Sequence, residues 1–149
     1  GVTQALVTTG STTRVIGRKA ENELWQIGVQ HPRDAGKLLG IISLTQKSIS
    51  TSGDYQRYFE KGGKRYHHIL SPKTGYPVED VMAVTVVTSK DCVDVDILST
   101  GVFALGYPEG MRFVEREKDL EAIIVTTDGK IHLSSGLKGK VKELVRRID

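Results

Sequence analysis

Short runs rich in β-branched or alternating apolar residues, separated by turn-forming residues, fill most of this chain. Such runs are typical of strands, because successive side chains of a strand point to opposite faces. We predict strands over residues 5–9, 14–18, 24–30, 39–44, 47–51, 55–59, 64–70, 81–89, 121–126 and 130–133. Gly62 and Gly63 separate two of these runs, and Asp128 and Gly129 separate two others, as hairpin turns require. Consecutive hairpins favour a mainly antiparallel sheet.

The apolar period changes after about residue 90, which indicates helix in the later part of the chain. One helical face is predicted from residues that recur at intervals of three and four, namely Val95, Leu98, Val102 and Leu105. Ser89 or Asp91 is its candidate N-cap. A second helix is predicted over residues 109–117, and the spacing of Val141, Leu144, Val145 and Ile148 predicts a third at the tail. Strands grouped into hairpins, with helices placed late in the chain, predict the α+β class.

The length and composition of the chain are those of one folded domain. The 149 residues suffice for a single core, so we expect one domain over 1–149.

The net charge of the chain is +3, but basic and acidic residues are interleaved except at Lys138, Lys140, Lys142, Arg146 and Arg147. A solvated helix face explains that cluster better than a nucleic-acid surface, so no nucleic-acid partner is expected. Strand-like sequence follows Gly1 at once, which we interpret as the carboxyl-terminal part of a longer protein.

Asp96 and Thr100 are the first candidate site. They lie one helical turn apart, roughly opposite the apolar face, so both side chains could hold one ligand. Ile97 and Phe103 flank the same side, which predicts a buried helix, and a buried carboxylate needs a partner or a metal. Carboxylate and hydroxyl oxygens suit Mg²⁺. The alternative is that this face simply meets solvent. Cys92 is the only cysteine, which excludes a cysteine-based metal cluster.

Two further segments carry residues suited to anion or ribose contacts. In a strand, His67 and His68 point to opposite faces, so only one of them can serve a given site. The loop that follows, residues 72–77, contains Thr74 and Gly75, whose hydroxyl and amide could meet phosphate. Residues 50–54 end a strand with hydroxyls and exposed amides that could hold an anion or a ribose. In both segments an ordinary turn is the alternative.

The order of these segments resembles the carboxyl-terminal half of the ApbE family of flavin transferases. The family has T-S-G-D-Y, then H-I-x-D-P-x-T-G-x-P, then A-D-x-x-x-T followed by F-x-x-G. The chain reads TSGDY at 51–55, HILSPKTGYP at 68–77 and VDILST at 95–100, followed by Phe103 and Gly106. It departs at Ser71, where the family usually has Asp, and at Gly10 and Ser11, where a glycine pair is common.

The resemblance implies magnesium-dependent transfer of FMN from FAD to a threonine or serine hydroxyl of an acceptor protein, with release of AMP. It implies that Asp96 and Thr100 bind Mg²⁺ and that His68 is the catalytic histidine, as general base or positioning group. The residues implied to lie near the flavin or its phosphates are Thr51, Ser52, Gly53, Asp54, His68, Thr74 and Gly75.

The partners implied by the resemblance are FAD, the acceptor protein and an amino-terminal segment that completes the pocket. The implied location is extracytoplasmic, the cell envelope or periplasm, with a cytoplasmic location left open. Two alternatives remain at this point. One is hydrolysis of the FAD pyrophosphate, and the other is a flavin-binding or interaction module without catalysis.

Overall fold

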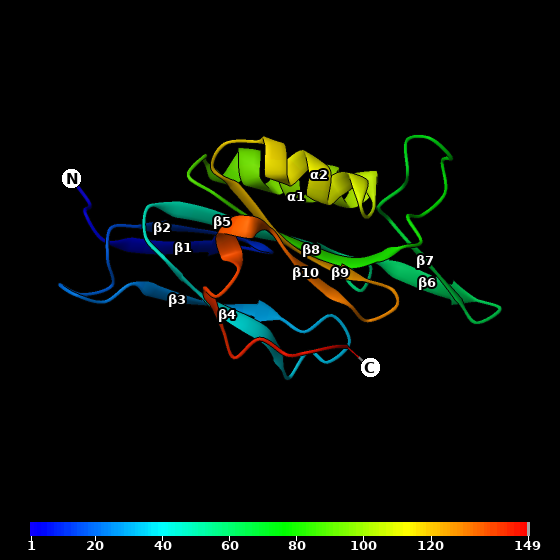
Figure 1. Cartoon of the computed structure of the whole chain (residues 1–149), viewed down its shortest axis with the longest axis horizontal. Coiled ribbons are helices and arrows are strands. Elements are labelled where there is room, and N and C mark those ends of the chain that lie inside the picture. The colour runs from blue at the N-terminus through cyan, green and yellow to red at the C-terminus, as the bar shows by residue number, and fades with distance from the viewer. Residues whose placement is uncertain (149) are drawn as a thin grey trace.

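The computed structural model describes residues 1–148, which form three layers (Figure 1). The middle layer is a six-stranded sheet with the order β1-β2-β5-β8-β9-β10. Its strands are β1 (Ala5–Thr9), β2 (Thr12–Ile16), β5 (Lys47–Gly53), β8 (Val81–Thr88), β9 (Leu120–Thr126) and β10 (Ile131–Leu133). A three-stranded sheet, β11-β4-β3, covers one face; it contains β3 (Trp25–Gln30), β4 (Leu38–Leu44) and β11 (Val141–Lys142). All these neighbours pair antiparallel, which confirms the predicted class.

A two-stranded hairpin of β6 (Tyr58–Lys61) and β7 (Lys64–His67) projects from one end of the molecule (Figure 1). Its turn is formed by Gly62 and Gly63 at φ angles of 60° and 75°, as the sequence predicted. The prediction that strand begins at residue 55 was wrong. Residues 54–57 form a turn and bend, held where the Gln56 amide donates to the Gly53 carbonyl and the Asp54 amide to that of Met82.

The other face of the six-stranded sheet is covered by two helices, α1 (Cys92–Leu105) and α2 (Glu109–Arg116) (Figure 1). Asp91 caps α1, because its carboxylate accepts hydrogen bonds from the amides of Val93 and Asp94 at 3.0 Å each. A short 3₁₀ helix, η1 (Ser135–Leu137), follows β10. In the part of the chain that the structure describes, no helix has the length and hydropathy to cross a bilayer.

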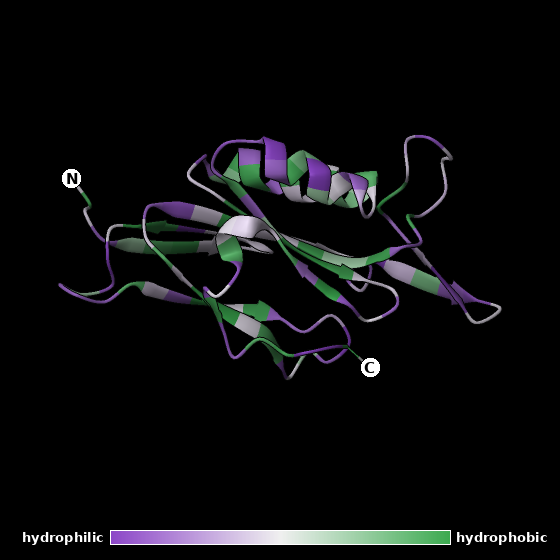
Figure 2. Ribbon diagram, in the orientation of Figure 1, coloured by the Kyte–Doolittle hydropathy of each residue, from purple (hydrophilic) through white to green (hydrophobic). Residues whose placement is uncertain are grey.

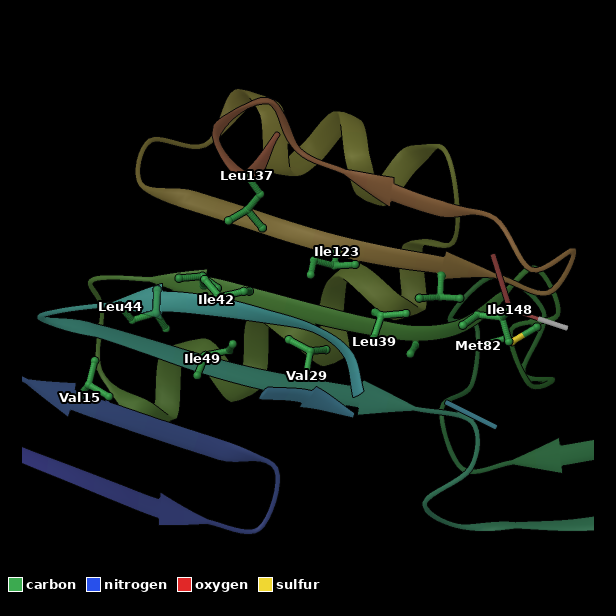
Figure 3. Packing of buried hydrophobic residues seen from close by; sticks show 13 residues of the cluster. Val15, Val29, Leu39, Ile42, Leu44, Ile49, Met82, Ile123, Leu137 and Ile148 are labelled. Atoms are coloured by element: carbon green, nitrogen blue, oxygen red, sulfur yellow. The ribbon is translucent and has the colours of Figure 1, made fainter. Parts of the chain in front are cut away.

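The hydrophobic core is divided by the six-stranded sheet into two clusters. One lies between the two sheets and includes Ile42, Ile49 and Ile123 (Figure 3). The other lies under the helices and includes Phe103 and Ile124. Because both faces of β8 are covered, all eight of its residues are buried, and apolar colouring extends through the middle of the molecule (Figure 2).

The predicted tail helix was wrong. Its apolar residues do pack against the core between the sheets, but the backbone forms β11, in which Val141 pairs with Ile42 of β4. Gly139 and Glu143 have positive φ angles of 73° and 52°, which interrupt a helix on either side of β11. The edge of β4 supplies hydrogen-bond partners that a tail helix would have left unused.

Candidate active site

Strand β5 runs beneath α1 and presents a different chemistry to each of its two faces. Ser48, Ser50 and Ser52 point toward the helix side, where Ser50 and Ser52 bond to groups of α1. Ile49 points to the core between the sheets. The alternation of a strand thus places a row of buried hydroxyls against one helix.

The Asp96 carboxylate is held by two hydroxyls, one from β2 and one from this row on β5. Its Oδ1 accepts hydrogen bonds from Thr12 Oγ1 of β2 and from Ser50 Oγ of β5, each at 3.0 Å. Its Oδ2 accepts none from residues 1–148. The carboxylate is therefore fixed through one oxygen, and the exposed residue leaves the other available, so Asp96 could serve as a cation ligand.

Thr100 lies one turn further along the same face of α1. Its Oγ1 is 3.1 Å from Ser52 Oγ and 3.3 Å from the Asp96 carbonyl. The expectation of a buried helix on this side was wrong, because Asp96 and Thr100 are exposed and Ile97 is 65% exposed. The two oxygen donors suit Mg²⁺, and their exposure leaves room for substrate and water oxygens. Among residues 1–148 no cluster of three or more acidic, histidine or cysteine side chains forms a metal site.

His68 lies between two buried residues that attach its segment to the helices. His67 packs edge-on against Phe103 of α1, and Ile69 belongs to the cluster beneath the helices. His67 is thus the structural histidine and His68 the exposed one, with Nδ1 3.2 Å from the Arg57 carbonyl. A carbonyl can only accept, so Nδ1 carries a proton and the neutral ring keeps a free lone pair on Nε2.

The loop of residues 71–77 forms one wall of a cleft of about 400 Å³ at the carboxyl end of α1. Ser71 and Thr74 line the cleft opposite Ala104, which lies one helical turn beyond Thr100. The face that carries Asp96 and Thr100 therefore continues into the cleft. The Gly75 amide was a candidate phosphate contact in the sequence. In the structure it donates to the Ser71 carbonyl at 2.8 Å. Ser71 Oγ accepts from the Lys73 amide at 3.3 Å, which stabilises the turn.

The four residues 51–54 do not share one face. Ser52 points to α1, whereas Thr51 lines a cleft of about 540 Å³ together with Ser11, Tyr55 and Arg57. Gly53 lies under the Tyr55 ring, where an added Cβ would meet Cε1 at 2.3 Å. Burial, followed by the nearby Asp54 carboxylate, raises the pKa of Tyr55, so its phenol stays protonated at neutral pH.

Asp54 forms a buried ion pair. Arg33 Nη1 and Nη2 donate to its two carboxylate oxygens at 2.6 and 2.7 Å, and Arg65 Nη1 lies 3.5 Å away. Asp54 is 5% exposed, so its carboxylate is occupied by arginine. The structure gives it a role in attaching the loop after β3 to the end of β5.

Sequence reasoning missed Arg33, Thr12 and Ser99, and it linked Ser52 to an anion, a ribose or the flavin and not to Thr100. Ser99 joins the hydroxyl cluster through a 2.9 Å contact between its Oγ and that of Ser52. The serines at every second position of 48–52 were a usable signal, since period two in a strand places them on one face. Arg33 had no local signal, because its partner lies 21 residues away.

Comparison with known proteins shows the family of the chain. Residues 1–124 match the model of the ApbE family. The FAD:protein FMN transferase of Klebsiella pneumoniae strain 342 is 39% identical over 135 residues, which cover 90% of this chain and 41% of that protein. The enzyme of the same name from Treponema pallidum is 32% identical, with 96% and 42% covered.

Solved structures agree with the sequence match. The ApbE protein of Thermotoga maritima superposes with a TM-score of 0.82 at 36% identity, covering 94% of this chain and 45% of that one. The Pseudomonas stutzeri flavinyl transferase ApbE gives 0.77 at 32%, with 97% and 46% covered. The chain thus spans about two-fifths of the length of these curated relatives and somewhat under half of these solved chains. By its sequence and its fold, the chain belongs to the ApbE family.

Proposed function

We propose that this chain carries part of the active site of a magnesium-dependent FAD:protein FMN transferase. The observation that carries the proposal is the exposed face of α1, where Asp96 Oδ1 is fixed by two hydroxyls and Oδ2 is left open. Relatives named FAD:protein FMN transferase, 39% and 32% identical to this chain, give the class of reaction.

Asp96 and Thr100 would hold the Mg²⁺ ion, and a bound ion would neutralise charge on the FAD pyrophosphate. The cleft that continues their face, lined by Ser71 and Thr74, is where we place the phosphates. Of the other residues implied by the resemblance, Thr51 borders the second cleft and is our candidate for a flavin contact. Gly53, Asp54 and Gly75 act by shaping the backbone around these clefts.

In the proposed reaction, a threonine or serine hydroxyl of the acceptor attacks the phosphorus atom of the FMN moiety. The new bond joins the acceptor oxygen to this phosphorus, and the bond between it and the bridging pyrophosphate oxygen breaks, so that AMP leaves. His68 Nε2 takes the hydroxyl proton, since Nδ1 donates to the Arg57 carbonyl and leaves Nε2 as the acceptor.

We further propose that a segment outside this chain supplies the rest of the flavin pocket. The relatives are more than twice as long as the part that matches, and the Asp96 face of α1 is open. The chain by itself should therefore bind FAD weakly. Joining it to the part of the Klebsiella pneumoniae relative that it does not match should restore tight binding.

The test is to incubate this joined protein with FAD, MgCl₂ and a threonine-containing acceptor peptide, and to weigh the peptide. We expect a gain of one FMN mass with AMP released in equal amount. Asp96→Asn should remove the gain, and replacing the peptide threonine by alanine should do the same.

Two results would contradict the proposal. FMN and AMP released while the peptide mass stays unchanged would identify hydrolysis of FAD instead of transfer. Tight FAD binding without any turnover, under conditions where a full-length relative modifies the peptide, would identify a flavin-binding module. Full activity of Asp96→Asn would refute the assignment of the metal ligand alone.

A further inference from the structure

Three hydroxyl groups between β5 and α1 form a continuous series of hydrogen bonds. Thr100 Oγ1 lies 3.1 Å from Ser52 Oγ, which lies 2.9 Å from Ser99 Oγ. Ser99 Oγ in turn donates to the Asp96 carbonyl at 3.0 Å. The series therefore begins at one proposed cation ligand and ends on the backbone of the other.

The direction of each hydrogen bond follows from the carbonyl at its end. A carbonyl only accepts, so the single proton of Ser99 Oγ is used there. Ser52 then donates to Ser99, and Thr100 donates to Ser52 at 3.1 Å. The Asp96 carbonyl, 3.3 Å from Thr100 Oγ1, is a more distant acceptor for the same proton. With its proton donated to Ser52, Thr100 keeps its oxygen lone pairs free.

A second contact from the same strand fixes the other ligand. Ser50, two residues before Ser52 and therefore on the same face of β5, donates to Asp96 Oδ1 at 3.0 Å. Ser50 is fully buried and Ser52 is 7% exposed, so water competes little with either contact. The strand thus holds both ligand side chains through alternate residues.

We propose that Ser50 and Ser52 are positioning residues of the cation site: Ser50 orients the Asp96 carboxylate, and Ser52 fixes the rotamer and lone pairs of Thr100. This inference rests on the proposed function, because it takes Asp96 and Thr100 as the ligands. Neither serine is proposed as a ligand of the cation. Removing groups that orient metal ligands typically weakens metal binding about 10- to 100-fold.

The test measures Mn²⁺ binding by electron paramagnetic resonance on this chain, joined as above to the unmatched part of the relative, and on the Ser50→Ala and Ser52→Ala variants of the joined protein. We expect each variant to bind about tenfold more weakly or worse. Ser48→Ala is the matched control, because Ser48 is fully buried on the same face but donates to the Lys90 carbonyl at 2.7 Å. That carbonyl also accepts from Arg14 at 2.9 Å, so the control leaves it satisfied and should leave Mn²⁺ affinity unchanged.

A second measurement needs no metal. Three-bond NMR couplings report the χ1 rotamer of Thr100, which should be single in the parent chain and in Ser48→Ala but averaged in Ser52→Ala. If Ser52→Ala unfolds, Ser52→Cys preserves the size of the side chain while weakening its hydrogen bonds.

The outcomes separate this inference from the proposed function. Mn²⁺ bound equally well by the parent chain and both serine variants, with an unchanged Thr100 rotamer, would overturn the inference and leave the cation site intact. No saturable Mn²⁺ binding by the parent chain joined to the unmatched part of a relative would overturn the cation site and, with it, the proposed function.

Discussion

At the scale of single residues, Asp54 was a candidate ligand contact in the sequence, but the structure shows its carboxylate in an ion pair. Its carboxylate is 5% exposed and accepts two hydrogen bonds from Arg33. Removing one partner of such a pair leaves the other charge buried and unpaired. Asp54 therefore acts first of all in stabilising the fold.

We predict that Asp54→Ala lowers the free energy of unfolding by about 3 kcal/mol, because Arg33 loses its carboxylate. Urea denaturation measures this directly. Lys37→Ala is the control, since it breaks only an exposed contact with Asp34 and should cost less than about 1 kcal/mol. Equal losses for the two variants would contradict the structural role of Asp54.

Asp119 gives a pH-dependent prediction at the same scale. Burial raises the pKa of Asp119, but hydrogen bonds from Lys47 and from the hydroxyl and amide of Ser89 outweigh it, so the pKa lies below its ordinary value. A lowered pKa stabilises the fold at pH values above that of the unfolded carboxyl, about 4, and the stabilisation is lost as pH falls toward the lowered value.

The expected result is that Asp119→Asn costs about 1 kcal/mol at pH 6, a modest value because the side chain is 38% exposed. Asparagine tolerates the φ angle of 59° at this position, so the substitution tests the charge and its hydrogen bonds. The difference in unfolding free energy between the parent protein and Asp119→Asn should be smaller at pH 3 than at pH 6. A constant difference across this range would show that the charge is unimportant.

At the scale of elements, α1 combines an apolar side that packs on the sheet with an open side that carries the candidate ligands. Gly101 lies beside Thr100, and an added Cβ there would meet no atom within 4 Å. Gly110 of α2 differs, because its Cβ would meet the Val102 carbonyl oxygen at 2.7 Å. Close packing therefore requires glycine at position 110, whereas no contact requires it at position 101.

Gly101→Ala should raise the free energy of unfolding by about 0.5–1 kcal/mol, since alanine favours helix and nothing obstructs it. Gly110→Ala should lower it, because the two helices would have to separate. Thermal unfolding of both variants, followed by circular dichroism, checks the pair. Stabilisation by both substitutions would mean that α2 does not pack closely on α1.

The elements also show what the sequence could predict. Hairpins and α1 follow from local signals, such as the glycines at 62 and 63 and the Asp91 cap, and these were confirmed. Asp96 and Thr100 became candidate ligands through their helical spacing, and the structure places them one turn apart on α1. The tail was mispredicted because its strand depends on pairing with β4, a hundred residues earlier. The Ser52 contact with Thr100 likewise depends on where α1 lies over β5, which no local pattern contains.

At the scale of the whole molecule, the six-stranded sheet belongs to both hydrophobic clusters. Neighbouring residues of β9 illustrate this, because Ile123 packs toward the second sheet and Ile124 toward the helices, both fully buried. Neither outer layer can therefore lose its packing without uncovering a face of the same sheet. We expect the three layers to unfold together.

Trp25, the only tryptophan of the chain, packs against the cluster between the sheets. Its fluorescence reports that layer, while far-ultraviolet circular dichroism reports the helices. Ile123→Ala and Ile124→Ala should each cost about 2–5 kcal/mol and shift both signals to the same lower urea midpoint. Midpoints that separate for the two signals would show that the layers unfold independently.

The alternation of side chains along β5 also determines whether this strand can tolerate a change in length. Odd and even positions of this strand serve different purposes, since Ile49 fills the core while Ser50 and Ser52 reach α1. Inserting or deleting one residue in β5 would exchange the two sets, placing hydroxyls in the hydrophobic core and an isoleucine beside the candidate ligands Asp96 and Thr100. The proposed cation site and the hydrophobic core thus depend on the same register of β5, and a length change in this strand would disrupt both at once.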